Sequence, residues 1–176
     1  MQLNRQFSEE ILPVTVLAAA ASSLTGNTTA VDIQDYRKVA FLVTRGADSA
    51  QTFTTTITVQ ACNTAAGGTP VAIPFRYRSY EQSGTAADLP TTNPTLATTA
   101  GFTTSTAATT TSTANYFIEV DEENIWNVST ISDLGTYKYV RVVLSTQAGS
   151  APIGTVVALM ANPKYAGTQV SRSVLS

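Results

Sequence analysis

The chain of 176 residues contains no histidine. Histidine is the commonest general base and a frequent metal ligand, so its absence removes Ser–His and Cys–His catalytic pairs and the usual zinc sites. The clustered carboxylates, Glu9-Glu10 and Asp121-Glu122-Glu123, are adjacent in sequence and point in different directions, so they do not make an acid–base pair. We therefore expect no enzymatic activity, no cofactor and no metal site.

The acidic run at 121–123 has one other possible use, as part of a calcium loop. It lacks the alternating ligand spacing and the glycine that such a loop needs. We interpret it instead as an acidic turn after a strand that ends at Val120.

Cysteine is represented only by Cys62. One cysteine excludes an intrachain disulfide and a cysteine-based metal cluster. Because Cys62 follows a strand-like run, we expect it to be a small buried apolar residue.

Charge is also scarce. Charged residues make up 12% of the chain, about half of the ~25% that is usual in soluble domains. The net charge is −2, and no basic run is longer than Arg37-Lys38, so nucleic acid is not an expected partner. No apolar stretch approaches the ~20 residues of a membrane-spanning helix. The sequence also contains no glycine-rich phosphate loop, so a small-molecule substrate is not expected. A neutral surface of this kind suits a chain that is largely covered by neighbours.

What is present is a strong period of two, which is typical of strands. Gly67-Gly68 predicts a hairpin between two such runs, and Pro74 argues for an edge position or a bulge. Three further runs are apolar on both sides and are candidates for central strands. The alternating runs are 53–61, 71–77 and 116–120, and the apolar runs are 38–44, 137–145 and 155–161.

Seven or eight short strands separated by glycine-rich breakers predict an all-β antiparallel β-sandwich. Helix signals are poor, and the best is a short turn at 8–12 that Ser8 could cap. The expected core residues lie in the apolar or alternating runs. They are Phe41, Val43, Ile57, Val59, Ile73, Val140, Val142, Val157 and Leu159.

Two segments do not fit a compact sandwich, the stretch 83–114 and the C-terminal tail 162–176. Residues 83–114 form a long Thr/Ala-rich loop, of which 89–114 contains no charged residue. Such a segment buries too little apolar surface to become ordered alone, so we expect other chains to hold it. We divide the chain into an N-terminal arm (1–10), a sandwich domain (11–161, with the loop 83–114) and a C-terminal tail (162–176).

Two stretches, 12–68 and 137–165, resemble structural proteins of tailed bacteriophages. The first contains a Gly-Asn turn, a VDI-x-x-Y step at 31–36, an apolar strand, and a Thr-rich strand that ends in a small-residue hairpin. The second has a paired strand, a Gly/Ser/Pro turn, and an apolar strand that leads into a Pro-x-Tyr tail. The loop 83–114 is not part of this pattern. Proteins of this group are non-enzymatic virion parts, including capsid cement (decoration) proteins and neck or tail components.

The resemblance implies a cement protein on the outer surface of the phage capsid. Such a protein would bind the major capsid protein and itself, with a trimer as the expected homo-oligomer. The expected contact residues lie in the arms and in the Thr-rich loop. They are Arg5, Phe7, Leu89, Leu96, Phe102, Tyr165 and Arg172.

Two alternatives stay open. One is a neck or tail component of the same virion. The other is a carbohydrate-binding or adhesin module, which would need an exposed aromatic platform. The aromatic residues available for such a platform are Tyr77, Tyr80, Tyr116, Trp126, Tyr137 and Tyr139.

Overall fold

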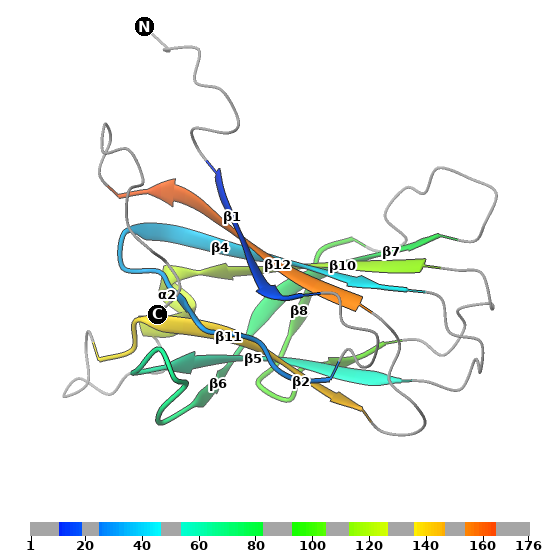
Figure 1. Cartoon of the computed structure of the whole chain (residues 1–176), viewed down its shortest axis with the longest axis horizontal. Helices are drawn as coiled ribbons and strands as arrows, with labels where there is room; N and C mark the ends of the chain where they lie inside the picture. The colour runs from blue at the N-terminus through cyan, green and yellow to red at the C-terminus, as the bar shows by residue number, and fades with distance from the viewer. Residues whose placement is uncertain are drawn as a thin grey trace, which may run out of the picture.

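The computed structural model describes residues 11–18, 25–46, 54–82, 93–104, 113–126, 136–146 and 154–164. Two antiparallel sheets pack face to face, as Figure 1 shows, which confirms the predicted all-β sandwich. The first eight strands are β1 (Ile11–Leu17), β2 (Gly26–Asn27), β3 (Val31–Asp32), β4 (Tyr36–Arg45), β5 (Thr55–Cys62), β6 (Val71–Ile73), β7 (Phe75–Gln82) and β8 (Thr95–Ala97). The others are β9 (Phe102–Thr103), β10 (Thr113–Asp121), β11 (Tyr139–Thr146) and β12 (Gly154–Pro163). The described residues also include a short helix, α2 (Glu122–Trp126).

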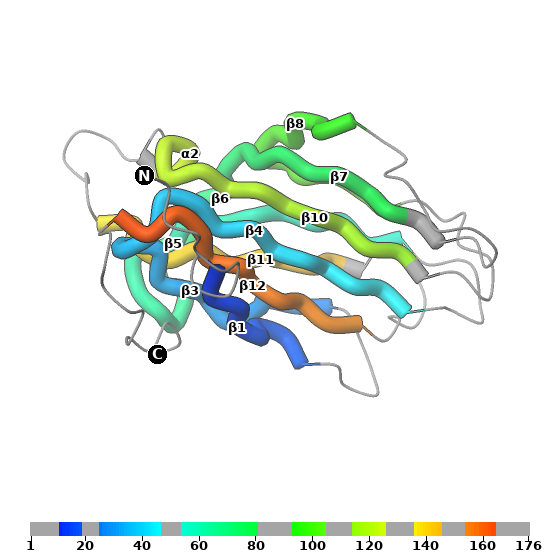
Figure 2. Tube along the Cα trace, turned by 90° about the horizontal axis from the view of Figure 1, so that it is seen from above, coloured from blue at the N-terminus to red at the C-terminus, as the bar shows by residue number. Residues whose placement is uncertain are grey.

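The strands divide into two sheets of different width. Sheet A has the order β1-β12-β4-β10-β7-β8, which Figure 2 shows from above. Sheet B has the order β2-β11-β5-β6, with β3 also paired to β11 and β9 to β5. The three runs that are apolar on both sides became β4, β11 and β12, and each lies inside its sheet as predicted.

The pairing is nested. β1 pairs with β12, β2 and β3 pair with β11, β4 pairs with β10, and β5 pairs with β6. Each pair along the chain is enclosed by the one before it, and the β12–β4 and β11–β5 pairings roll this long hairpin into two layers. Nested antiparallel pairs wound in this way are the topology of a jelly roll, a double-sheet form of the sandwich.

An insertion interrupts the nest between β6 and β10. Pro74 separates β6, in sheet B, from β7, in sheet A, so it lies where the chain changes sheets rather than within a strand. β7 extends sheet A beyond β10, and β8 then pairs with β7. After a turn at 98–101 the chain returns to sheet B, where β9 pairs with β5.

This insertion corrects the expectation for the Thr-rich segment. Residues 93–104 are held by their own sandwich: Ala97 and Thr104 are buried, and Thr104 forms two hydrogen bonds with Thr55. The Thr55 N–H donates to Thr104 Oγ1 at 3.0 Å, and the Thr104 N–H donates to the Thr55 carbonyl at 2.9 Å. Because threonine has a high β-propensity, the segment supplies strands instead of a loop. Residues 89–92 and 105–112 lie outside the described residues.

The core lies between the sheets, and most of it was predicted. Seven of the nine expected core residues are fully or nearly fully buried: Phe41, Val43, Ile57, Val59, Ile73, Val140 and Val142. Val157 and Leu159 are wrong, since both are only partly buried. Val156, Ala158 and Met160 of the same strand point inward instead. The run 155–161 is apolar on both faces, so its sequence pattern could not show which alternate residues face the core.

The turn expected at 8–12 is also wrong where it is described, because Ile11 and Leu12 open β1; residues 8–10 lie outside the described residues. Helix α2 follows β10 directly, at the acidic turn. The Asp121 N–H donates to Asn124 Oδ1, one half of a capping box, and Glu122 and Glu123 favour a helix N-terminus. At the other end, β12 continues to Pro163, two residues beyond the boundary expected at 161.

Gly101 offers a test of the insertion. It has a φ of +75°, and an added Cβ would lie 2.1 Å from the carbonyl oxygen of Ile57. We expect Gly101→Ala to lower the free energy of unfolding by ~2 kcal/mol or more, because the clash is with the backbone of β5. The control is Gly26→Ala, where φ is +94° but nothing lies within 4 Å, and which should cost only ~1 kcal/mol. Urea unfolding of both variants measures the difference; equal costs would contradict the close approach.

The phase of β12 can be tested in the same way. Val156→Asp should cost ~3 kcal/mol or more, because it buries an unpaired charge between the sheets. Val157→Asp should cost only ~1 kcal/mol, because its side chain reaches solvent. The two melting temperatures give the comparison, and the reverse order would place Val157 in the core.

Candidate interaction surface

The outward side of sheet A, called here the outer face, is unusually apolar at its centre. Its residues follow from the alternation of burial along each strand and from the strand register. They are Pro13 and Thr15 on β1, Thr155, Val157 and Leu159 on β12, Ala40, Leu42 and Thr44 on β4, Asn115, Phe117 and Glu119 on β10, Arg76, Arg78 and Tyr80 on β7, and Leu96 on β8.

Five of these side chains form what we call the apolar strip: Ala40, Leu42, Phe117, Val157 and Leu159. Leu42 pairs with Val157 on one side and with Phe117 on the other, and Leu159 pairs with Ala40. All five are half-buried. In an antiparallel sheet with one solvated face, that face is usually polar. An apolar strip across three neighbouring strands is therefore a candidate contact surface.

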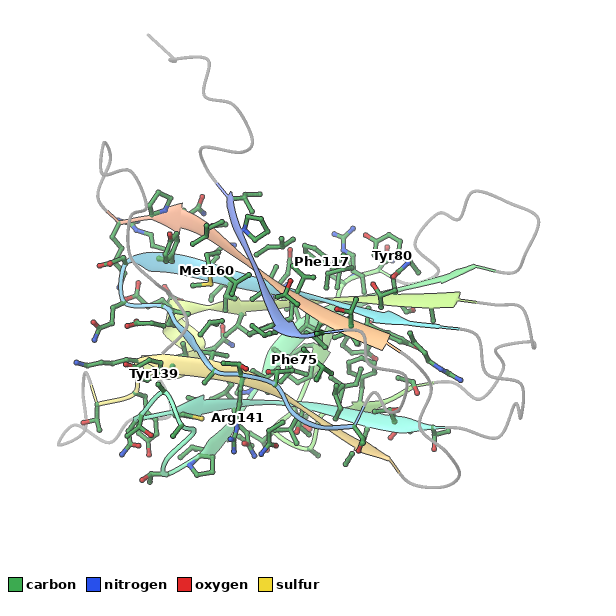
Figure 3. The ribbon with its side chains drawn as sticks, viewed as in Figure 1. Phe75, Tyr80, Phe117, Tyr139, Arg141 and Met160 are labelled. Carbon is green, nitrogen blue, oxygen red and sulfur yellow. The ribbon has the colours of Figure 1, made fainter. Side chains whose placement is uncertain are left out.

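Beyond β10 the outer face becomes basic and aromatic. β7 carries Arg76, Arg78 and Tyr80, and Figure 3 shows Tyr80 and Phe117 on the outward side of the sheet. Leu96 on β8 is 65% exposed, and it pairs with Arg76. Arginine and tyrosine are enriched in the residues that dominate binding energy at protein interfaces. Within the described part of the chain, neither arginine forms an ion pair.

The outward side of sheet B differs. It is lined by residues such as Thr56, Thr58 and Gln60, and it carries its own hydrogen bonds. Arg141 donates to Gln60 Oε1 from Nε at 3.0 Å and from Nη2 at 2.9 Å, and its guanidinium lies over Gly67, where a Cβ would have no room. The two faces of the sandwich are thus chemically distinct, and sheet A has the more apolar one.

A charged depression of about 760 Å³ lies at one end of the sandwich. Lys38 Nζ lies 3.0 Å from Asp121, and Lys164 Nζ lies 2.5 Å from Glu122. These pairs tie α2 and the end of β10 to β4 and β12, which is a structural use of the acidic turn. Among the residues that the structure describes, no cluster of three potential metal-binding side chains is present. The depression is lined by Arg37, Lys38, Asp121, Glu122, Glu123, Asn162 and Lys164.

Two of the seven expected contact residues are described. Leu96 is exposed at the edge of the outer face. Phe102 is stacked on Tyr77 with ring centroids 3.8 Å apart, and it packs against the core. Their contact with a partner stays a prediction. Arg5, Phe7, Leu89, Tyr165 and Arg172 lie outside the described residues.

The aromatic residues proposed for a sugar platform lie on different faces. Tyr116 is buried in the core, and Tyr77 packs between the sheets against Phe102. Tyr80 belongs to the outer face of sheet A, whereas Tyr139 lies on β11 in sheet B (Figure 3). Tyr137 packs against the core, and the side chain of Trp126 is not among those described. The described aromatic rings therefore do not share one flat surface.

Cys62 is fully buried, as predicted. Burial raises the pKa of its thiol, and the nearby Arg141 guanidinium lowers it by a smaller amount. A buried thiol with a raised pKa is unreactive, which fits its use as a small packing residue.

No helix in the described part of the chain is long and apolar enough to cross a membrane. Comparison of the chain with protein-family models, with curated proteins and with solved structures found no match.

Proposed function

We propose that this chain is a non-enzymatic structural protein of a virion, a cement protein that binds the outside of a phage capsid and stabilises contacts between major capsid subunits. The observation that carries the proposal is the apolar strip of Ala40, Leu42, Phe117, Val157 and Leu159 on an otherwise solvated face of the sandwich. A strip of this kind, in a chain with few charges, suits binding to another protein more than it suits chemistry on a small molecule.

The topology is compatible with this use. Jelly rolls are found in viral capsid proteins and also in lectins. Because one fold hosts many functions, the topology alone does not choose between these two. The scattered aromatic residues favour the virion reading over a carbohydrate-binding module.

Attachment in this proposal is multivalent. The apolar strip provides one contact, and the arms, with Arg5, Phe7, Tyr165 and Arg172, provide others. Several weak contacts in one oligomer raise the effective affinity without any one of them being strong. Few charges take part, so salt should weaken the attachment only modestly.

The test is a heat-release assay on phage heads. Heads stripped of this protein should release DNA at a lower temperature than decorated heads, and adding back the purified chain should restore the higher temperature. A chain shortened by residues 1–10 should still fold, because β1 begins at Ile11 and the sandwich stays complete. It should bind heads more weakly, because it has lost one of its arms. Identical release curves with and without the protein would contradict the cement role. Presence in the particle without binding to heads would favour a neck or tail component instead.

The apolar strip can be tested separately. Val157→Lys places a charge in the strip on a partly solvated strand position, so the protein should fold but bind heads at least tenfold more weakly. Thr58→Lys is the matched control, because Thr58 is also a half-buried outward position, but on sheet B. Equal binding by both variants, measured by co-sedimentation with heads, would remove the strip from the capsid interface.

A further inference from the structure

The two strands β10 and β7 carry complementary side chains in the same rows of the outer face. In one row, Ala40, Glu119, Arg76 and Leu96 follow one another across β4, β10, β7 and β8. The order is apolar, acidic, basic, apolar. Such a row is complementary to the same row of a second copy that has been turned over. The acid of one copy then meets the base of the other, and the apolar residue at one end meets the apolar residue at the opposite end.

An interface around a two-fold axis needs this property, because the same patch is used by both copies. Suppose that the axis runs between β10 and β7, along the strands. Glu119 then faces the partner's Arg76, and Ala40 faces the partner's Leu96. An axis that placed β7 on β7 would instead bring arginines against arginines.

We propose that the outer face of β4, β10, β7 and β8 binds a second copy of this chain, in an isologous dimer held at its centre by Glu119 and the partner's Arg76. The next rows agree. Phe117 and Arg78 are cross-strand neighbours, so Phe117 faces the partner's Arg78, which suits a cation–π contact. Asn115 and Tyr80 are likewise neighbours, so the amide of one copy faces the phenol of the other.

Cross-strand complementarity also has a simpler use, since opposite charges stabilise a sheet when they pair within it. Here they do not pair. Glu119 and Arg76 are both exposed and directly opposite each other, yet among the described residues neither forms an ion pair. The charges are therefore available to a second copy. Leu96, at the end of the same row, is 65% exposed and is the most exposed large apolar side chain among those described.

The size of the patch sets the expected strength. Three strands about 4.8 Å apart and about eight residues long, together with the three-residue β8, span roughly 400 Å² per copy. This is below the ~800 Å² per partner of a standard interface, so we expect a dimer that forms at micromolar concentration rather than an obligate one. The patch includes Ala40, Leu42 and Phe117 of the apolar strip, so in the dimer only Val157 and Leu159 on β12 stay available to a capsid partner.

The proposal rests on the proposed function only for the use of the dimer in a virion, because the contact itself is measured without capsids. The experiment is sedimentation velocity of the full chain from ~1 to ~500 µM. The wild type should pass from monomer to dimer. Glu119→Arg alone and Arg76→Glu alone should each weaken dimerisation at least tenfold, because each places like charges opposite each other. The double variant E119R/R76E should restore it.

Arg37→Glu is the matched control, since Arg37 is an exposed strand arginine at the charged depression, away from this patch. It should dimerise as the wild type does. Circular dichroism separates the proposal from a purely intramolecular pairing, in which the swaps would change the melting temperature and leave the association unchanged. A wild type that stays monomeric throughout, a trimer such as the bacteriophage resemblance implies, or a double variant that fails to recover while it is folded would each overturn the proposal. Loss of dimer with retained binding to heads would leave the cement role intact.

Discussion

Strands β4 and β12 are apolar on both faces, and the rest of the structure depends on this constraint. Each lies inside sheet A, so its inward side chains, such as Phe41, Val43 and Met160, close the core against sheet B. Their outward neighbours are also apolar, and among the described residues no third layer covers that side. The inward side chains of these strands therefore line the core, and their outward side chains, which include Leu42, Val157 and Leu159, form most of the apolar strip.

The sequence was sufficient for the class of fold and for most of the core, because strict alternation reports which side of a strand is buried. β5 is the clearest case: Ile57 and Val59 are buried, and Thr58 between them is only half-buried. It was insufficient for β12, where Val156 and Val157 are chemically alike and only the packing of the two sheets decides which one points inward. The apolar strip was missed for the same reason, since runs that are apolar on both sides were interpreted only as a sign of central strands.

The insertion was the other difficulty. Residues 89–114 within it are mainly Thr and Ala without charge, which is the composition of a mobile loop, and only long-range pairing turns parts of this stretch into β8 and β9. The glycine at Gly101, which lets the chain approach Ile57, is one local signal that could have indicated an ordered crossing between sheets. Acidic residues followed by Asn124 could likewise have indicated α2, although five residues are too few for a clear helical period.

Nested pairing also governs the order in which the molecule can be completed. Among the described strands, β12 is the one neighbour of β1 in its sheet, so this pairing cannot form until β12 has been synthesised. Until then β4 also lacks its neighbour β12, and the nascent chain exposes strand edges that could join those of another chain. Pro13, exposed in the middle of β1, cannot donate a backbone hydrogen bond to such an intruder. A residue that contributes little to the finished core can thus protect the edge of β1 before β12 pairs with it.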